Sequence, residues 1–159
     1  MALTQTLTTS FKGELLLAVH DFRTGATGGD TYKIALYTSS ATLDANTTAY
    51  TATNEVTGTN YTAGGATLTN LGVVTSNTNA SAGTGYIDFS DATWGTSTIT
   101  ARGALIYNTT PSANSNANTT LTNATVCVLD FGGDKTSTAG DFTVIFPAAA
   151  NTTAIVRVA

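Results

Sequence analysis

Apolar and polar residues alternate in short runs along most of the chain. In the run 31–38, Tyr32, Ile34 and Leu36 fall on one face of an extended chain. Comparable runs occupy residues 66–75, 86–90, 99–107, 125–131, 141–146 and 154–158. A period of two is typical of β-strands, and Gly-, Asn- and Ser-rich turns separate the runs. Because no helical pattern intervenes between these strands, the sequence predicts a mostly-β fold, an antiparallel β-sandwich or barrel.

One segment near the N-terminus has a different period. Phe11, Leu15, Val19 and Phe22 recur at near-helical spacing, and Ser10 precedes them as a candidate N-cap. We therefore expect one short N-terminal helix of about three turns, which packs its apolar stripe against the sheet and ends before the Gly-rich stretch 24–29.

The pattern divides the chain into an extended Thr-rich arm, residues 1–9, and a single β domain, residues 10–159. Within the domain, the low-complexity stretch 108–123 is rich in Asn, Thr and Ser, which predicts a long exposed loop between two strands. Residues 42–56 are polar and irregular, with Tyr50 and Val56 as anchors to the core.

Composition indicates what the surface is made of. Charged residues make up 10% of the chain, against about 25% in an average soluble domain. Thr, Ser and Asn replace them, so we expect a threonine-rich solvent face on the sheets. The net charge is −4, and the six Lys and Arg residues are scattered. This argues against binding to nucleic acid or to an anionic membrane, since both require clustered cations.

Cys127 is the only cysteine, which leaves no intrachain disulfide, and its apolar run 124–129 predicts a buried thiol in a core strand. The N-terminus lacks the basic and apolar regions of a signal peptide. The apolar run 15–19 is too short to span a membrane. We expect the chain to be made and folded in a cytosol.

Candidate catalytic residues are few. His20 is the only histidine, and we expect it on the last turn of the helix, near the negative end of the dipole, where the adjacent Asp21 is badly placed to orient it. Zinc and iron sites need more His and Cys ligands than the chain has. We therefore predict no enzyme, no catalytic residue and no cofactor.

Two kinds of acidic site stay open as alternatives. Calcium needs only oxygen ligands, and aspartates flank two candidate turns: Asp88 and Asp91, and Asp130, Asp134 and Asp141. Such aspartates more often bond their own backbone, so we predict no bound metal. A hydrolase would need two facing carboxylates, such as Glu55 and Asp88.

Five stretches resemble a widespread group of small structural proteins of tailed-phage virions: 28–38, 61–65, 101–108, 128–135, and 142–147 followed by 154–158. The resemblance spans nearly the whole chain in the same order, except that the stretch 108–123 is longer than the group's usual hairpin. It implies a non-enzymatic β protein of the virion, and some members resemble capsid decoration (cement) proteins.

We therefore expect a capsid decoration protein on the outer shell, bound to the major capsid protein or to other virion proteins, and self-associated, with a trimer favoured. The alternatives are a tail, neck or fibre-associated subunit, and a carbohydrate-binding adhesin that uses Trp94, Tyr61 and Tyr86. The expected interface residues lie in the arm, at the lone tryptophan and in the last strand: Leu3, Leu7, Trp94, Ile155, Val156, Arg157 and Val158.

Overall fold

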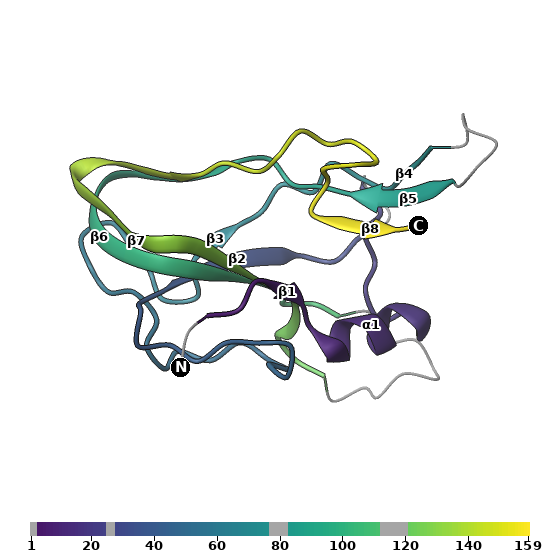
Figure 1. The fold of residues 1–159 in the computed structure, drawn as a ribbon, viewed down its shortest axis with the longest axis horizontal. Coiled ribbons are helices and arrows are strands. Elements are labelled where there is room, and N and C mark those ends of the chain that lie inside the picture. Colours follow the sequence, from purple (N-terminus) through teal and green to yellow (C-terminus); the bar gives the residue numbers. More distant parts are fainter. Residues whose placement is uncertain (1–2, 25–27, 77–82, 112–120) are drawn as a thin grey trace.

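A computed structural model describes residues 3–24, 28–76, 83–111 and 121–159 (Figure 1). The elements along the chain are β1 (Thr6–Leu7), α1 (Thr9–Leu16), β2 (Tyr32–Tyr37), β3 (Ala66–Thr67), β4 (Val74–Ser76), β5 (Thr84–Ile87), β6 (Ala92–Asn108), β7 (Ala124–Val144) and β8 (Val156–Val158). The paired strands are antiparallel throughout. The predicted mostly-β fold with one short N-terminal helix is confirmed.

The strands form two sheets. The larger has the order β1-β7-β6-β2-β3, and the smaller has the order β4-β5-β8. β6 and β7 are 17 and 21 residues long, against about 5–6 in a typical strand. Together they form a ribbon that curves at one end of the molecule and returns above the rest of the large sheet, toward the small one (Figure 1).

The bend in this ribbon explains one difference from prediction. Residues 125–131 and 141–146 were expected as two strands separated by turns, but the first and most of the second belong to β7. Gly132 has φ 73° and Ala139 has φ 47°, and the pairing with β6 shifts register three times between Trp94 and Gly103. Bulges and left-handed residues increase the local bend and twist of a ribbon, so the chain turns here without ending the strand.

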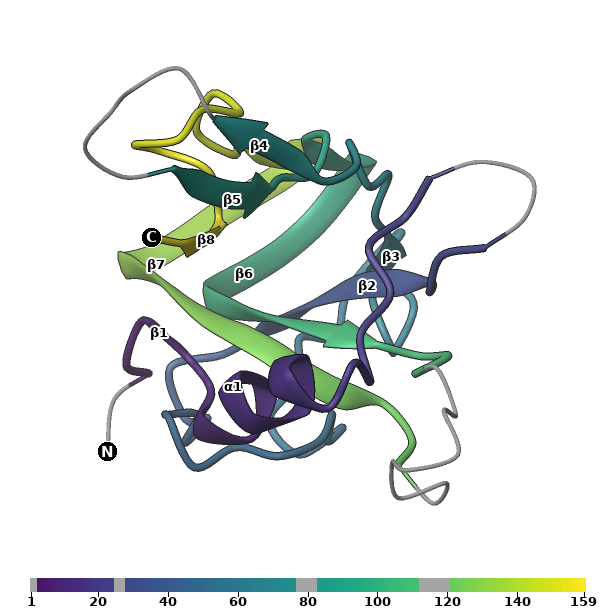
Figure 2. The same cartoon turned by 90° about the vertical axis from the view of Figure 1, so that its right-hand side faces the viewer.

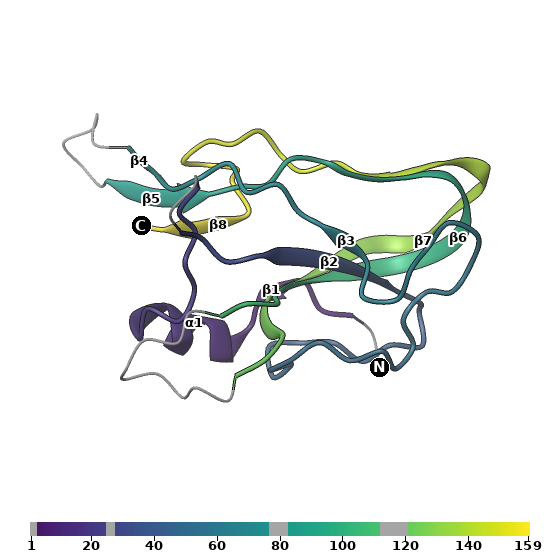
Figure 3. The same cartoon turned by 180° about the vertical axis from the view of Figure 1, so that it is seen from behind.

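Burial differs between the two halves of the ribbon. Residues 92–101 of β6 mostly alternate between buried and exposed, whereas Gly103 to Asn108 are all buried. The second half is covered on both faces. One face meets the main core beside Phe11 and Phe89, and the other meets a second cluster that includes Leu43. Figures 2 and 3 show α1 lying beside this half of the ribbon.

Hydroxyl groups pair across the curved half of the ribbon. Thr93 and Thr143 lie 2.9 Å apart, as do Thr100 and Thr136, each measured between the Oγ1 atoms. All four residues are exposed. The predicted threonine-rich solvent face is therefore present on this ribbon.

α1 is shorter than predicted. Its N-cap is Thr8, whose hydroxyl accepts the N–H of Phe11, and it ends at Leu16. Ala18 then takes a left-handed conformation with φ 53°. The N–H groups of Ala18 and Val19 donate to the carbonyls of Leu15 and Glu14, which is the Schellman arrangement that stops a helix.

Val19 and Phe22 still reach the core, but from the segment after the helix rather than from an apolar stripe on the helix.

In the part of the chain that the structure describes, no helix has the length and apolarity needed to cross a membrane.

The described part of the expected arm is not a free arm. Leu3 is buried in the second cluster, and the N–H of Thr4 donates to the carbonyl of Leu43 at 3.0 Å. Thr6 and Leu7 then pair with Val128 and Cys127 of β7. Residues 3–9 are therefore built into the domain by backbone pairing and apolar burial.

The expected long loop is also shorter at its start. Asn108 is the last residue of β6 and is fully buried, so the connection to β7 begins at Thr109. Its central residues, 112–120, lie outside the described part of the chain.

Candidate functional site

The residues expected at an interface fall into two groups. Leu3, Trp94 and Val156 are buried, with exposed fractions of 3%, 6% and 5%, so their side chains pack inside the folded monomer. Trp94 is part of β6, and its ring lies 6.2 Å from that of Phe142, between centroids. All three are large apolar side chains whose best place is the monomer core.

The other four remain accessible. Leu7 and Ile155 are half-buried, and Arg157 and Val158 are exposed. Leu7, Ile155 and Arg157 line a cavity of about 440 Å³ between β1 and β8. Leu7 and Ile155 also line a second cavity of about 200 Å³, together with Leu129 of β7. The structure thus brings together three residues from opposite ends of the chain.

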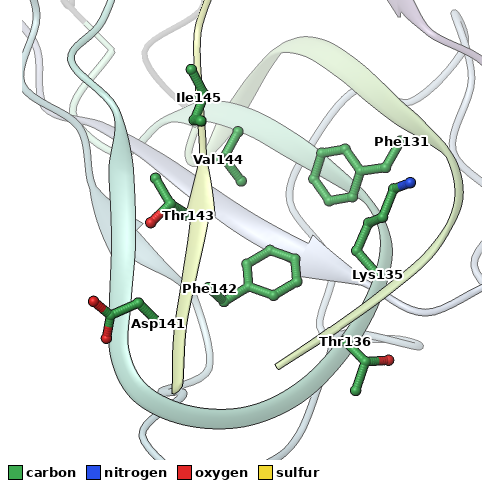
Figure 4. A pocket seen from close by; sticks show the side chains of 8 residues that line it. All are labelled: Phe131, Lys135, Thr136, Asp141, Phe142, Thr143, Val144 and Ile145. Carbon is green, nitrogen blue, oxygen red and sulfur yellow. The ribbon is translucent and has the colours of Figure 1, made fainter. Parts of the chain in front are cut away.

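A third cavity, of about 470 Å³, begins two residues further along β7 (Figure 4). Among the residues that the structure describes, β7 and the residue that follows it form its walls. Phe131 and Phe142 project into it from the two arms of the bent strand, with ring centroids 6.3 Å apart. Ile145 lies on its rim and is 75% exposed. We call the three cavities together the edge groove.

The edge groove is open because β7 has a free edge. β1 pairs only with Cys127 and Val128, and within the described ranges no strand pairs with that edge of β7 further along. Across the ribbon, β2 covers the outer edge of β6 from Gly103 onward, and the bridge between Thr59 and Thr98 covers it nearer the bend. Such an edge presents unpaired N–H and C=O groups. The sequence pattern predicted two separate strands in place of β7, so it gave no indication of this free edge.

Two cations mark the edge groove, Lys135 at the bend and Arg157 at the β8 end. The ion pairs among the described residues are Arg23–Asp21 and Arg102–Asp130, and the contact between His20 and Glu14 would be a third only with a protonated histidine. Lys135 and Arg157 take part in none of them. Asp141 lines the bend as well, but its Oδ1 accepts the N–H of Thr96 at 3.1 Å, and its carboxylate points away from Phe131 (Figure 4).

Exposed apolar side chains gather at one end of the molecule. This end is formed by α1 and by the small sheet β4-β5-β8, and it faces the viewer in Figure 2. Of the seven large apolar side chains that are exposed in the described chain, six lie in or next to these elements: Leu16, Leu17, Leu71, Val73, Val74 and Val158. We call these six residues the apolar end.

His20 does not lie on the helix, contrary to prediction. It follows the left-handed Ala18, is 6% exposed and stands among Phe11, Phe22 and Tyr32. Its interaction is with side chains rather than with the helix dipole, because the chain has already reversed at this point.

The hydrogen bonds around His20 form a closed network. Asn108 donates from Nδ2 to His20 Nδ1 at 3.2 Å and to Asp30 Oδ2 at 2.7 Å, while its Oδ1 accepts the N–H of Thr110 at 3.0 Å. Because Nδ1 accepts, the ring proton is on Nε2, which donates to Glu14 Oε2 at 2.8 Å. Burial lowers the pKa of His20 and outweighs the opposing effect of Glu14. The network holds a neutral histidine in place and leaves it enclosed by aromatic rings.

The two carboxylates considered for a hydrolase are both engaged in the fold. Glu55 is buried and accepts the hydroxyls of Tyr50 and Tyr61 at 2.6 and 2.7 Å and the N–H of Gly64 at 2.7 Å. Asp88 accepts the N–H of Phe89, and burial raises its pKa. Neither lines one of the cavities described above, so no facing pair of acids in these cavities supports hydrolysis.

The metal alternative finds no ligand set in the described chain, where no three His, Cys, Asp or Glu residues come together. Asp130 instead pairs with Arg102, with Oδ1 and Nε 3.0 Å apart. Asp91 accepts the N–H of Phe146.

The sugar-binding platform is not assembled either. Trp94 is buried, and the hydroxyl of Tyr61 is occupied by Glu55 and by the N–H of Leu36. The ring of Tyr61 packs against Trp94 with centroids 5.9 Å apart. The two rings therefore stabilise the domain rather than offering a stacking surface to a sugar.

Comparison with known proteins adds no relative. Neither the models of protein families nor the curated proteins nor the solved structures contain a match to this chain.

Proposed function

We propose that this chain is a structural subunit of a tailed-phage virion, and that it decorates the outer face of the capsid as a cement protein. The observation that carries the proposal is the apolar end, where six large apolar side chains are left exposed on a surface with few charges. Large apolar side chains that gather exposed at one end of a folded chain favour contacts with other proteins. The resemblance of five sequence stretches to virion structural proteins supports the virion as the place of those contacts.

The chemistry of the surface suits such a role. A particle outside a cell meets changing pH and salt, and a fold with few ion pairs responds weakly to both. Binding of the folded form to a shell would stabilise the shell and the subunit together, because it removes folded protein from the unfolding equilibrium. The proposal therefore includes the major capsid protein, or another virion protein, as partner.

Self-association belongs to the same proposal. We expect a homo-oligomer, with a trimer as the favoured form, held by the apolar end. Sedimentation of the purified protein tests this. Replacing Leu16 and Val74, which are exposed, by Ser should weaken an oligomer that buries them, whereas the same two substitutions in a chain that is always monomeric would leave sedimentation unchanged.

The virion role is tested on purified particles with and without the protein. We expect hundreds of copies per particle, as surface decoration of a shell requires, and we expect particles without the protein to open at lower temperature. Particles that lack it and withstand heat and chelation equally well would refute the cement role. A few to a few dozen copies per particle would instead place the subunit in the tail, neck or fibre.

A further inference from the structure

We propose that the edge groove binds an extended strand of a different protein, which adds to the free edge of β7 and packs apolar side chains against Phe131 and Phe142. The strand has apolar residues at alternate positions and carboxylates toward its two ends. This inference rests on the proposed function, since it names the contact by which the subunit would hold its neighbour.

The backbone of β7 indicates a strand as the ligand. Beyond Val128 the edge has no partner strand in the described chain, and an added strand would satisfy its N–H and C=O groups. Alternate side chains of a strand point to the same side, so every second residue of the ligand would face the cavity at the bend. The walls of that cavity are apolar at Phe131, Phe142 and Val144.

The charges of the edge groove indicate which groups the two ends of the ligand carry. The chain has a net charge of −4, yet Lys135 and Arg157, which line the edge groove, are cations outside the ion pairs of the described residues. The one carboxylate side chain that lines the bend, Asp141, accepts the N–H of Thr96. Carboxylates on the incoming strand would complement them. A second copy docked edge to edge would bring its own Lys135 to the same interface, because such a contact uses the same surface twice. A different protein is therefore the better occupant.

The test uses the isolated protein and two short blocked peptides. In both, Val and Thr alternate; one has Glu at each end, and the matched peptide has Lys there. Trp94 is the only tryptophan and packs on Phe142, so its fluorescence reports filling of the cavity. Amide hydrogen exchange of residues 129–136 reports pairing with the edge.

We expect the Glu-ended peptide to bind about tenfold more tightly than the Lys-ended one, and to protect these amides. Lys135→Glu should remove or reverse the preference. Lys12→Glu, which changes another exposed lysine, on α1, should leave it unchanged. Saturation by neither peptide, equal affinity for both, or protection confined to other amides would each overturn the proposal.

Sedimentation of the Lys135→Glu variant tests whether a second copy of this chain, rather than a different protein, occupies the edge groove. If this variant loses the self-association of the parent protein, the edge groove holds a second copy, and the inference is wrong. The titration needs no particle, so its failure is distinct from a failure of the virion role, which is decided by particle composition and stability.

Discussion

Single residues decide where α1 begins and ends. Gly13 lies inside the helix, and a Cβ placed there would meet no atom within 4 Å. Ala18 lies just after the helix in the left-handed region, with φ 53°. Glycine is poorly suited to position 13, inside the helix, and well suited to position 18, in the left-handed region. The sequence has Gly and Ala the other way round, each at the less favourable position.

We therefore predict that opposite substitutions both stabilise the protein. Gly13→Ala should raise the free energy of unfolding by about 1 kcal/mol through helix propensity. Ala18→Gly should raise it by about 0.5–1 kcal/mol, because a left-handed conformation costs a residue with a Cβ more than it costs glycine. Urea unfolding measures both. Destabilisation by Ala18→Gly would show that Ala18 is not left-handed in the folded protein.

His20 sets a pH dependence at the same scale. Its pKa is lowered from 6.5 because burial disfavours the charged ring. The unfolded chain therefore takes up a proton near pH 6.5 that the folded chain does not accept until a lower pH. Since the unfolded state binds more protons in this window, the free energy of unfolding falls as the pH drops below 6.5, and it is fully retained above that value.

The prediction is a loss of stability on acidification that depends on His20. Urea unfolding across the window from about pH 7.5 to about pH 5.5 should show it in the parent protein. His20→Gln cannot take up the proton, so its stability should change less over the same range. Equal slopes for the two proteins would mean that another group controls this pH response.

At the scale of elements, the β6–β7 ribbon organises the fold. It joins the large sheet to the layer above it, and its bend creates the edge groove. Close approach of the two backbones fixes the start of the bend at Gly103. A Cβ there would lie 2.3 Å from the carbonyl oxygen of Leu129 and 3.0 Å from Cδ2 of Leu3.

Gly103→Ala should therefore destabilise the protein by about 1–3 kcal/mol, because the backbone of β7 would have to move. The matched variant is Gly85→Ala in β5, where a Cβ would meet nothing within 4 Å; its effect should stay within about 0.5 kcal/mol. Thermal or urea unfolding compares the two. Similar stability of both variants would argue against tight packing of β6 on β7.

At the scale of the whole molecule, the centre of the ribbon is closed from both faces. Cys127 lies there, is 3% exposed, and pairs with both β1 and β6. Burial raises the pKa of its thiol to about 12. A thiol reagent needs both access and a thiolate; Cys127 borders the second cavity of the edge groove but is only 3% exposed, and its thiol stays protonated.

Labelling of Cys127 should therefore require opening of the whole domain. We expect its rate near pH 8 to be far slower than that of an unfolded chain, and to rise with urea with the slope of global unfolding. The unfolded protein in concentrated urea is the control. A rate that is independent of urea would show that the ribbon opens locally, which the pairing on both sides of Cys127 argues against.

The sequence predicted the β class well and the extent of the elements less well. Alternation gave β2 within a residue or two of its ends, because Tyr32, Ile34 and Leu36 recur with a period of two even though both faces of the strand are mostly buried. It failed at β7, where Gly132 and Ala139 read as turn residues. A local pattern does not distinguish a turn that ends a strand from a bend within one, because the partner strand decides between them.

The residues of the candidate site were also predicted only in part. Leu7, Ile155 and Arg157 were predicted as contact residues and line the edge groove, whereas Leu3, Trp94 and Val156 are buried. All six belong to terminal segments or carry apolar character, and the sequence does not distinguish an apolar residue that binds a partner from one that fills the core. Which side of a strand faces the core depends on register with neighbours far away in the chain.

By itself, the sequence determined an antiparallel β protein with a hydroxyl-rich surface, few charges and one buried thiol, because composition and period act residue by residue. Tertiary structure alone decided that β7 is one bent strand, that it keeps a free edge, and that Leu7 and Ile155 meet beside it. The bend of β7 arises from its pairing with β6, and β1, more than a hundred residues away, pairs with one end of its edge; no local pattern contains either pairing.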